Sequence, residues 1–451
     1  MDALPIEVLD YIFNFFEDDS LQACEKVCKK WARVITCTCF YARKCERLLK
    51  LDHSLTSTFN CQKFDTEIRS NPEACKKFYY GLKQLPARWV ADAVPQISSF
   101  YCKSGEVSES WIRNHNYTGV YDMVWLPEQS YLICSVYDTI QIWDMAQYKR
   151  INVIEASLLD SDREKTTSFH ASGPALITGT SRGRLQAFDL TTSKLLGETT
   201  PDPNVDEMVC DIKGFKNRLL STDWRGLLAM WRWKLSDKGD IEFLLEKRFY
   251  PKFPDDDDRV IQKYKSRFGE RLIDFNDYIG VTNCHDMFCI FDVNKQDFAT
   301  WIKTERSVLC CQVFENSAYW GGPGGRLFHY KQTEKNVVVI ESNDELEKYV
   351  TKYEDSITSV TVSKDKIIFG DVNAEIHCLT RDPKTPLGQN SFRFMLESGH
   401  AYKSFIWALE IDSSRIFSGD SNGCLVVHDF WKDDEEASEP ESKRPKLLSG
   451  H

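Results

Sequence analysis

The chain has 451 residues, of which 42% are hydrophobic and 13% aromatic, and it carries a formal net charge of −11. This length predicts two or three domains, and the composition is typical of a soluble globular protein. An acidic chain is a poor candidate for binding the phosphate backbone of nucleic acids, because proteins of that class carry basic patches.

The first residues, MDALPIEVLD, lack the basic segment and the small-residue cleavage site of a secretory signal. No apolar run reaches the roughly 18 residues that a membrane span needs. The 16 cysteines are spread along the chain, so we expect reduced thiols and a cytoplasmic or nuclear location. The cysteines near the start contain no C-x2-C pair, which favours buried helix residues over zinc ligands.

Residues 4–31 predict two short amphipathic helices, and a third is expected in the stretch FYARKCERLLK. The first helix should start near Pro5, and Asp19 or Ser20 should cap the second. The expected apolar faces are Leu9, Ile12, Phe13 and Phe16 in the first helix and Leu21, Cys24, Val27, Cys28 and Trp31 in the second. Such short helices bury little surface alone, so these faces must meet either the rest of the chain or a partner protein.

The pattern LPIEVLDYIF followed by DSLQACEKVCKKW, within residues 3–45, resembles the F-box motif. That motif opens with Leu-Pro, continues with an apolar helix and ends in Val-Cys-x-x-Trp. The resemblance implies binding to the Skp adaptor subunit of a cullin–RING ubiquitin ligase. The positions that match the motif, and that we expect to bind the adaptor, are Leu4, Pro5, Leu9, Ile12, Phe13, Leu21, Val27, Cys28 and Trp31.

We assign residues 1–48 to an F-box helical domain and residues 49–105 to a helical linker. Within the linker, the stretch SNPEACKKFYYGLKQLPARW predicts one helix, capped by Ser70 or Asn71. Pro72 fits its first position, and the helix is expected to end before Pro86.

From about residue 116, a unit of strand, tight turn and strand recurs seven times, from ICSVYDTIQIWD to IFSGDSNGCLVVHD. A large apolar residue stands two positions after each turn: Ile140, Leu185, Leu228, Phe288, Leu327, Ile376 and Leu425. Three positions further stand Trp143, Phe188, Trp231, Phe291, Tyr330, Leu379 and His428. A small residue, often Gly, precedes most turns. Paired strands repeated about every 40–50 residues predict the blades of a β-propeller.

The repeats resemble the WD-repeat family, with QIWD at 141–144 and SGH at 398–400, although AFD, IFD and VHD replace Trp-Asp elsewhere. The expected fold class is α+β multidomain: a small N-terminal helical F-box, a helical linker and an all-β propeller of about seven four-stranded blades. The propeller should span residues 106–432, and the charged tail, 433–451, should be disordered. The last repeat lacks an outer strand of its own, so we expect residues 109–116 to supply it and close the ring.

We identify no catalytic motif, no metal site and no cofactor motif, and therefore expect a non-enzymatic protein. The stretch GGPGGR at 321–326 predicts a tight turn, and His400 in SGH should orient the loop of its blade. Carboxylates clustered at the centre of the ring would instead favour an enzyme.

Relatives of the WD-repeat family that bind phosphorylated degrons place Arg clusters on the turns between second and third strands, where a guanidinium grips phosphate oxygens. The equivalent turns here hold Arg182, Arg184, Trp224, Arg225 and Arg326. Turns of other repeats are acidic. We therefore keep three interpretations: a phosphopeptide site, a surface for an unmodified protein, or Arg residues that only solvate the rim.

Together these features predict the substrate-recognition adaptor of an SCF-type ubiquitin ligase, with the Skp adaptor and a protein substrate as partners and no nucleic acid or membrane. The alternative is a WD-repeat scaffold without a ligase role. Two further segments stay open: residues 255–258, DDDD, as a solvated loop or a calcium or basic-partner site, and KRPK at 443–446 as an import signal or an inert tail.

Overall fold

A computed structural model describes residues 4–16, 18–36, 38–51, 68–88, 95–102, 119–136, 139–155, 166–199, 208–215, 218–223, 227–236, 239–249, 271–275, 278–282, 287–303, 309–314, 317–322, 324–325, 327–332, 338–341, 356–363, 366–380, 393–396, 400 and 404–431. The chain divides into two compact units. The helical unit comprises Met1–Ser98, Asp412–Ile416 and Val427–His451, and the sheet unit comprises Ser99–Ile411 and Phe417–Val426.

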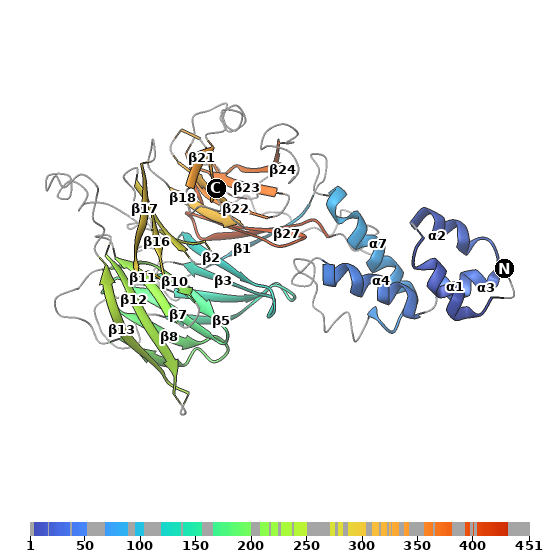
Figure 1. The fold of residues 1–451 in the computed structure, drawn as a ribbon, viewed down its shortest axis with the longest axis horizontal. Helices are drawn as coiled ribbons and strands as arrows, with labels where there is room; N and C mark the ends of the chain where they lie inside the picture. The colour runs from blue at the N-terminus through green and yellow to red at the C-terminus, as the bar shows by residue number, and fades with distance from the viewer. Residues whose placement is uncertain are drawn as a thin grey trace, which may run out of the picture. The chain divides into compact units, whose positions relative to one another are not determined.

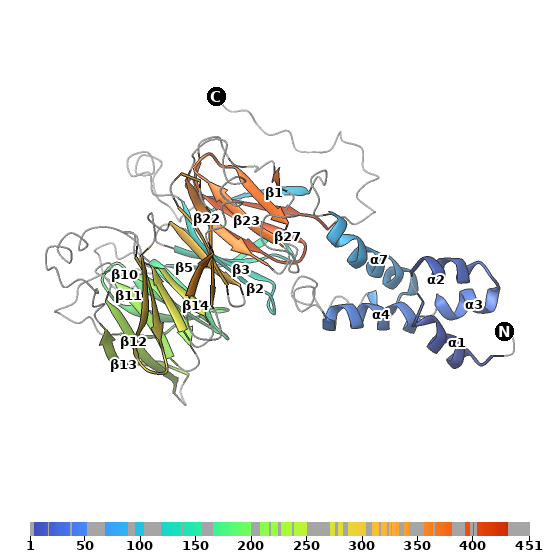
Figure 2. The same cartoon turned by 45° about the horizontal axis from the view of Figure 1, so that its top comes forward.

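The described helices belong to the helical unit, and Figure 2 shows α7 alongside α4. Their bounds are α1 Ile6–Phe13, α2 Asp18–Glu25, α3 Lys29–Ile35, α4 Thr38–Leu51 and α7 Pro72–Arg88. No described helix combines the length and the apolar character that crossing a membrane requires.

The second predicted helix is in fact two helices. We expected Leu21 to Trp31 to lie on one helix, but α2 ends at Glu25 and α3 begins at Lys29, with Cys28 as an extended N-cap residue. The break turns Val27 outward, so that 61% of this residue is exposed. The predicted caps are also displaced, because α2 already starts at Asp18 and includes Asp19 and Ser20.

The helix in the predicted linker begins as expected and ends later. The Asn71 carboxamide oxygen accepts hydrogen bonds from the backbone N–H groups of Glu73 (3.0 Å) and Ala74 (3.2 Å), which makes Asn71 the cap. However, α7 passes through Pro86 and ends at Arg88. Proline removes only one N–H so close to the end of a helix, and Leu85 just before it is buried, which helps to hold the last turn.

The core of the helical unit is built from aromatic and cysteine side chains of all these helices. Phe13 and Phe40 are buried, Cys45 on α4 donates to the Cys75 carbonyl oxygen on α7 at 3.6 Å, and the Phe13 and Trp31 rings meet edge to face at 5.3 Å. Trp431, near the end of the chain, packs on the same core: a Cβ added to Gly81 on α7 would lie 2.6 Å from its ring. The predicted linker helix is therefore part of the core of the helical unit.

Within the described residues, 28 strands make seven four-stranded sheets, as the repeat count predicted. Figure 1 shows these strands as arrows. The first strands of the sheets are β2 (Val120–Leu126), β6 (Thr166–Ser172), β10 (Val209–Phe215), β14 (Arg271–Phe275), β18 (Cys310–Phe314), β22 (Ile357–Val362) and β26 (Ile406–Ile411). The second strands are β3 (Tyr131–Val136), β7 (Ala175–Thr180), β11 (Arg218–Asp223), β15 (Tyr278–Thr282), β19 (Ser317–Gly321), β23 (Lys366–Asp371) and β27 (Arg415–Asp420). The third strands are β4 (Thr139–Asp144), β8 (Leu185–Asp189), β12 (Leu228–Leu235), β16 (Met287–Asp292), β20 (Leu327–Gln332), β24 (Ile376–Thr380) and β28 (Cys424–Asp429). The fourth strands are β5 (Lys149–Glu155), β9 (Leu195–Glu198), β13 (Ile241–Phe249), β17 (Asp297–Lys303), β21 (Val338–Glu341), β25 (Arg393–Leu396) and β1 (Gln96–Tyr101).

The fourth strand of the last sheet corrects a prediction. A segment from before the repeats does complete this sheet, whose order is β1-β28-β27-β26. The segment is Gln96–Tyr101, however, and not residues 109–116, which lie outside the described residues. The stretch QISSFY lies inside the predicted helical linker, and its short polar-apolar alternation was too weak a strand signal on its own.

Two repeated features position the strands. Four third strands end in Asp, and each of these carboxylates accepts a hydrogen bond from the backbone N–H two residues on, for example at 2.8 Å from Ala146 to Asp144 and at 3.0 Å from Thr191 to Asp189. This explains why Asp persists in AFD, IFD and VHD when Trp does not. The apolar column after the turns is buried in every repeat where the structure describes it, Phe288 being the exception whose side chain lies outside the description.

The small residue before each turn lets neighbouring sheets approach each other. A Cβ added to Gly370 on β23 would lie 2.5 Å from Ile406 on β26, and one added to Gly419 on β27 would lie 2.5 Å from Val120 on β2. Only glycine fits such a distance. The second of these contacts joins the last repeat of the sheet unit to the first.

Candidate functional site

The helix α1 is apolar on two opposite sides. Leu9 and Phe13 are buried in the core of the helical unit. Val8 and Tyr11 on α1, and Phe15 in the turn directly after it, are spaced by three and four residues and are exposed by 40%, 67% and 71%. We call these three residues the exposed α1 face. Its two aromatic rings pair edge to face with their centroids 5.0 Å apart, which leaves a continuous apolar surface without a described cover.

Polar contacts hold α1 in this orientation. The Arg43 guanidinium on α4 donates to both carboxylate oxygens of Asp10 on α1. The Lys30 ammonium on α3 donates to the carbonyl oxygen of Leu4 at 2.8 Å. Glu25 at the end of α2 accepts from the Lys76 ammonium on α7 at 2.7 Å. These contacts link the short helices to one another and fix the position of the exposed α1 face within the helical unit.

The structure separates the residues expected to bind the adaptor into two groups. Leu9, Phe13 and Leu21 are almost completely buried inside the chain, and Leu4 and Trp31 pack partly against the same core. Pro5, Ile12, Val27 and Cys28 keep part or most of their surface accessible. Matching a motif by position could not distinguish core from surface, and it missed Tyr11 and Phe15, whose only sequence signal is apolar character on the side of α1 opposite to the chosen face.

The turn between β7 and β8 carries two of the predicted substrate-binding residues. Arg182 is half-buried there, and the Thr180 hydroxyl oxygen accepts from the backbone N–H of Arg182 (3.4 Å) and of Arg184 (3.1 Å). Arg184 is 9% exposed, and its guanidinium lies 4.0 Å from the Glu198 carboxylate. Arg184 is thus turned toward its own sheet, and Arg182 is the more accessible of the two arginines. Trp224, Arg225 and Arg326 lie outside the described residues.

Two groups of side chains have donor atoms close enough to share a metal ion, with all atoms of a group within 4.8 Å: His400, Asp420 and Cys424, and Asp371, Glu375 and His377. Both ring nitrogens of His400 already contact protein, Asp420 at 3.1 Å and Ser418 at 2.8 Å. Asp420 also accepts from the backbone N–H of Cys424 at 2.8 Å. The first group therefore orients its turn, as we expected for His400, and Asp371 has the same role because it accepts from the Glu375 N–H at 2.9 Å.

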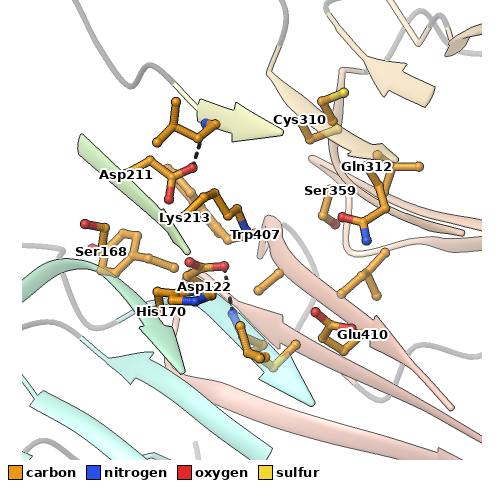
Figure 3. Close-up of a pocket in the computed structure, with 18 of the residues that line it drawn as sticks. Asp122, Ser168, His170, Asp211, Lys213, Cys310, Gln312, Ser359, Trp407 and Glu410 are labelled. Carbon is orange, nitrogen blue, oxygen red and sulfur yellow. Dashed lines mark hydrogen bonds between the residues drawn. The ribbon is translucent and has the colours of Figure 1, made fainter. Parts of the chain in front are cut away.

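The sheet unit contains a cavity of about 470 Å³ to which the first strand of every sheet contributes (Figure 3). We call it the axial cavity. Its titratable lining residues are Tyr121 and Asp122 on β2, His170 on β6, Cys210, Asp211 and Lys213 on β10, Cys310 and Cys311 on β18, and Glu410 on β26. The strands β14 and β22 contribute only uncharged residues, Leu272, Ser359 and Val360.

The charged groups of the axial cavity act on one another. Burial, followed by the Asp122 carboxylate, raises the pKa of Glu410 to about 8, and the Lys213 ammonium opposes part of this rise. Burial and the same ammonium lower the pKa of His170 to about 4, so this ring is neutral at physiological pH. Asp211 is fixed, because its carboxylate accepts from the backbone N–H groups of Ile212 (2.7 Å) and Leu272 (2.8 Å).

Sequence reasoning missed this cavity, although the strands carried a signal. Some predicted strands that are otherwise apolar contain a charged residue, namely Asp122, Asp211, Lys213 or Glu410. A charged residue inside a buried strand points to a lined cavity or a pair of charges. Which of these charges meet depends on how seven separate sheets are arranged, and no local pattern contains that information.

The comparisons with known proteins bear on both units. The F-box-like family matches residues 1–47. No curated protein matches the chain significantly. A chain in the crystal structure of the mitotic checkpoint complex is similar in fold, with a TM-score of 0.53 and 10% identity over 76% of this chain and 94% of that one. The computationally designed Ika8 protein aligns with a TM-score of 0.45 and 13% identity over 69% of this chain and 96% of its own.

Proposed function

We propose that this protein is the substrate-receptor subunit of an SCF-type ubiquitin ligase, in which the helical unit binds the Skp adaptor and the sheet unit binds the protein substrate. The observation that carries the proposal is the F-box-like region at residues 1–47, in which Tyr11 on the first helix and Phe15 in the turn after it are exposed. An apolar surface of this kind is stable in water when a partner covers it. Pro5, Ile12 and Val27 would extend the contact.

The sheet unit would be a closed WD-repeat-like propeller with seven blades. Three observations support this: each sheet has four strands, β26 contacts both β22 and β2, and all seven first strands line one cavity. The similarity in fold to a chain of the mitotic checkpoint complex agrees with it. A closed ring leaves rigid turns at its rim, which is where recognition usually takes place.

The proposed mechanism is proximity. The receptor has no chemical step of its own, because ubiquitin transfer belongs to other subunits, and it raises the effective concentration of a substrate lysine near them. The protein would act in the cytoplasm or the nucleus without a cofactor. The carboxyl groups in the axial cavity are the feature that an enzymatic alternative would use.

Binding of purified full-length chain to the purified Skp adaptor tests the proposal directly. Replacing Tyr11→Asp and Phe15→Asp together should weaken binding at least about a hundredfold, since burying two aromatic side chains contributes about 3–6 kcal/mol. Thermal unfolding should not change. Leu244→Asp is the matched control, because Leu244 on β13 is 61% exposed and the substitution has the same chemistry.

Two results would refute the proposal. If the wild-type chain does not bind the adaptor, the chain is better described as a scaffold without a ligase role. If the double variant binds as tightly as the wild type and the control, the exposed α1 face is not the docking surface.

A further inference from the structure

We propose that the axial cavity binds the cationic side chain of an unmodified Lys or Arg residue, presented by a segment of the protein substrate. The inference deepens the proposed function and rests on the sheet unit being the substrate-binding part. It names a substrate chemistry different from the phosphorylated segment that the Arg-bearing turns suggested.

The first argument is the charge of the lining. Asp122, Asp211 and Glu410 contribute three carboxyl groups, Lys213 contributes one ammonium, and the His170 ring is neutral. An excess of acidic groups on the walls of a cavity favours a positive occupant, because the protein walls lower the local dielectric and strengthen the attraction. A phosphate group would meet the same carboxylates and be repelled.

The second argument is that the Glu410 carboxyl lacks a described side-chain partner. Glu410 is half-buried, lines the axial cavity and makes no hydrogen bond or ion pair with a side chain of the described residues. The Lys213 ammonium lines the same cavity and acts on the Glu410 carboxyl, so it would compete with a positive occupant. Buried polar groups are normally paired, so a charged group that lines an open cavity without a partner points to a ligand.

The third argument is the aromatic border. Trp407 lines the axial cavity and is 36% exposed, so it is accessible from solvent. Its ring meets Tyr121 edge to face, with centroids 5.5 Å apart. Glu410 follows three residues along the same strand, about 10 Å away at the usual rise per residue. A long side chain could therefore place its apolar stem against Trp407 and its charged end near Glu410, with cation–π attraction along the way.

A metal ion fits this cavity less well than an organic cation. A metal needs several donor atoms within a few ångströms of one point. The two described groups that meet such a distance lie in the turns around His400 and His377 and include none of the carboxyl groups of the axial cavity. Separated carboxylates with an aromatic border fit the larger, flatter charge of a guanidinium or the end of a lysine chain.

Binding should release a proton. Glu410 is largely protonated at neutral pH, and a cation beside it would favour the carboxylate form. Affinity for a peptide that carries Arg should therefore rise as the pH increases from about 6.5 to 9 and then level off, because the guanidinium stays charged throughout this range.

Calorimetry with the full-length chain and an acetylated Gly-Ser-Arg-Ser-Gly amide is the test, with Lys, citrulline and phosphoserine at the central position as the other arms. The Arg or Lys peptide should bind at least tenfold more tightly than the citrulline peptide. Glu410→Gln should abolish the rise of affinity with pH. Lys213→Met should strengthen binding of the cationic peptides severalfold, because it removes a competing positive charge.

Equal binding of the citrulline peptide, preference for the phosphoserine peptide, or weaker binding by Lys213→Met would overturn the inference. Arg182→Ala is the control for the rim and should leave the affinity for the Arg peptide unchanged. The adaptor is absent from this assay, so a failure here leaves the adaptor measurement intact, and the reverse also holds.

Discussion

The helical unit and the sheet unit offer partners two different kinds of surface. The exposed α1 face consists of apolar side chains on a short helix and the turn after it, whereas the axial cavity is a hollow lined mainly by polar and charged groups. Apolar contact is non-directional and depends on the area covered, so it suits permanent docking. A charged cavity selects one chemical group, so it suits discrimination between substrates.

The two units also reach their stability in different ways. The helical unit depends on a few large side chains buried between short helices, with Phe13 at their centre. The sheet unit repeats one packing unit seven times and depends on small residues where neighbouring sheets meet. Loss of one large residue should therefore damage the helical unit most, and gain of one methyl group should damage the sheet unit.

The largest effect is expected in the helical core. Phe13→Ala should lower the free energy of unfolding of the helical unit by about 3–5 kcal/mol, the usual cost of removing a buried aromatic side chain. Urea unfolding followed by far-ultraviolet circular dichroism measures this. Tyr11→Ala on the opposite side of α1 should change stability by less than about 0.5 kcal/mol. Similar losses for both variants would contradict the two-sided description of α1.

A smaller effect is expected where the last repeat meets the first. Gly419→Ala should lower stability by about 1–3 kcal/mol, because the new methyl group would overlap Val120. Thermal unfolding of the full chain measures it. Gly173→Asn is the matched control, since Gly173 has a φ of +57° that Asn tolerates and open space around it. If Gly419→Ala were as stable as the wild type, β27 and β2 would not be in close contact in solution.

The smallest effects concern the pH dependence of stability. The pKa of Glu410 rises from 4.5 to about 8 on folding, so the folded chain holds the extra proton and stability falls as the pH rises through this range. Glu410→Gln should remove that loss and gain stability relative to the wild type between pH 6 and about 9. Melting temperatures across this range measure it, and a constant difference between variant and wild type would contradict it.

His170 should act at the opposite end of the pH scale. Its pKa falls from 6.5 to about 4 on folding, so the unfolded chain binds the proton more readily and stability falls as the pH drops from 6.5 to 4. His170→Gln should reduce this acid sensitivity, as melting temperatures at acidic pH would reveal. The His170 ring packs against Gly214, where an added Cβ would lie 2.1 Å from its Nε2. If the melting temperatures at acidic pH were the same for variant and wild type, the ring would be accessible to water instead.

Much of the architecture could be predicted because it depends on local patterns. The column from Trp143 to His428 marks seven repeats, and the structure has seven four-stranded sheets. The Leu-Pro start and the Val-Cys-x-x-Trp end identified the F-box-like region. Turn residues and strand alternation act between near neighbours in the chain, so the sequence displays them directly.

The identity of β1, the exposed side of α1 and the axial cavity were decided by tertiary structure. Gln96–Tyr101 becomes a strand only because β28 offers it a free edge. The segment of α1 and the turn after it is apolar on both sides in sequence, and packing against α3, where Trp31 meets the Phe13 ring, decides that Phe13 is buried while Phe15 is exposed. Asp122, Lys213 and Glu410 lie up to 288 residues apart in the chain and share one cavity only because separate sheets bring their first strands together, which is a long-range property that no short pattern encodes.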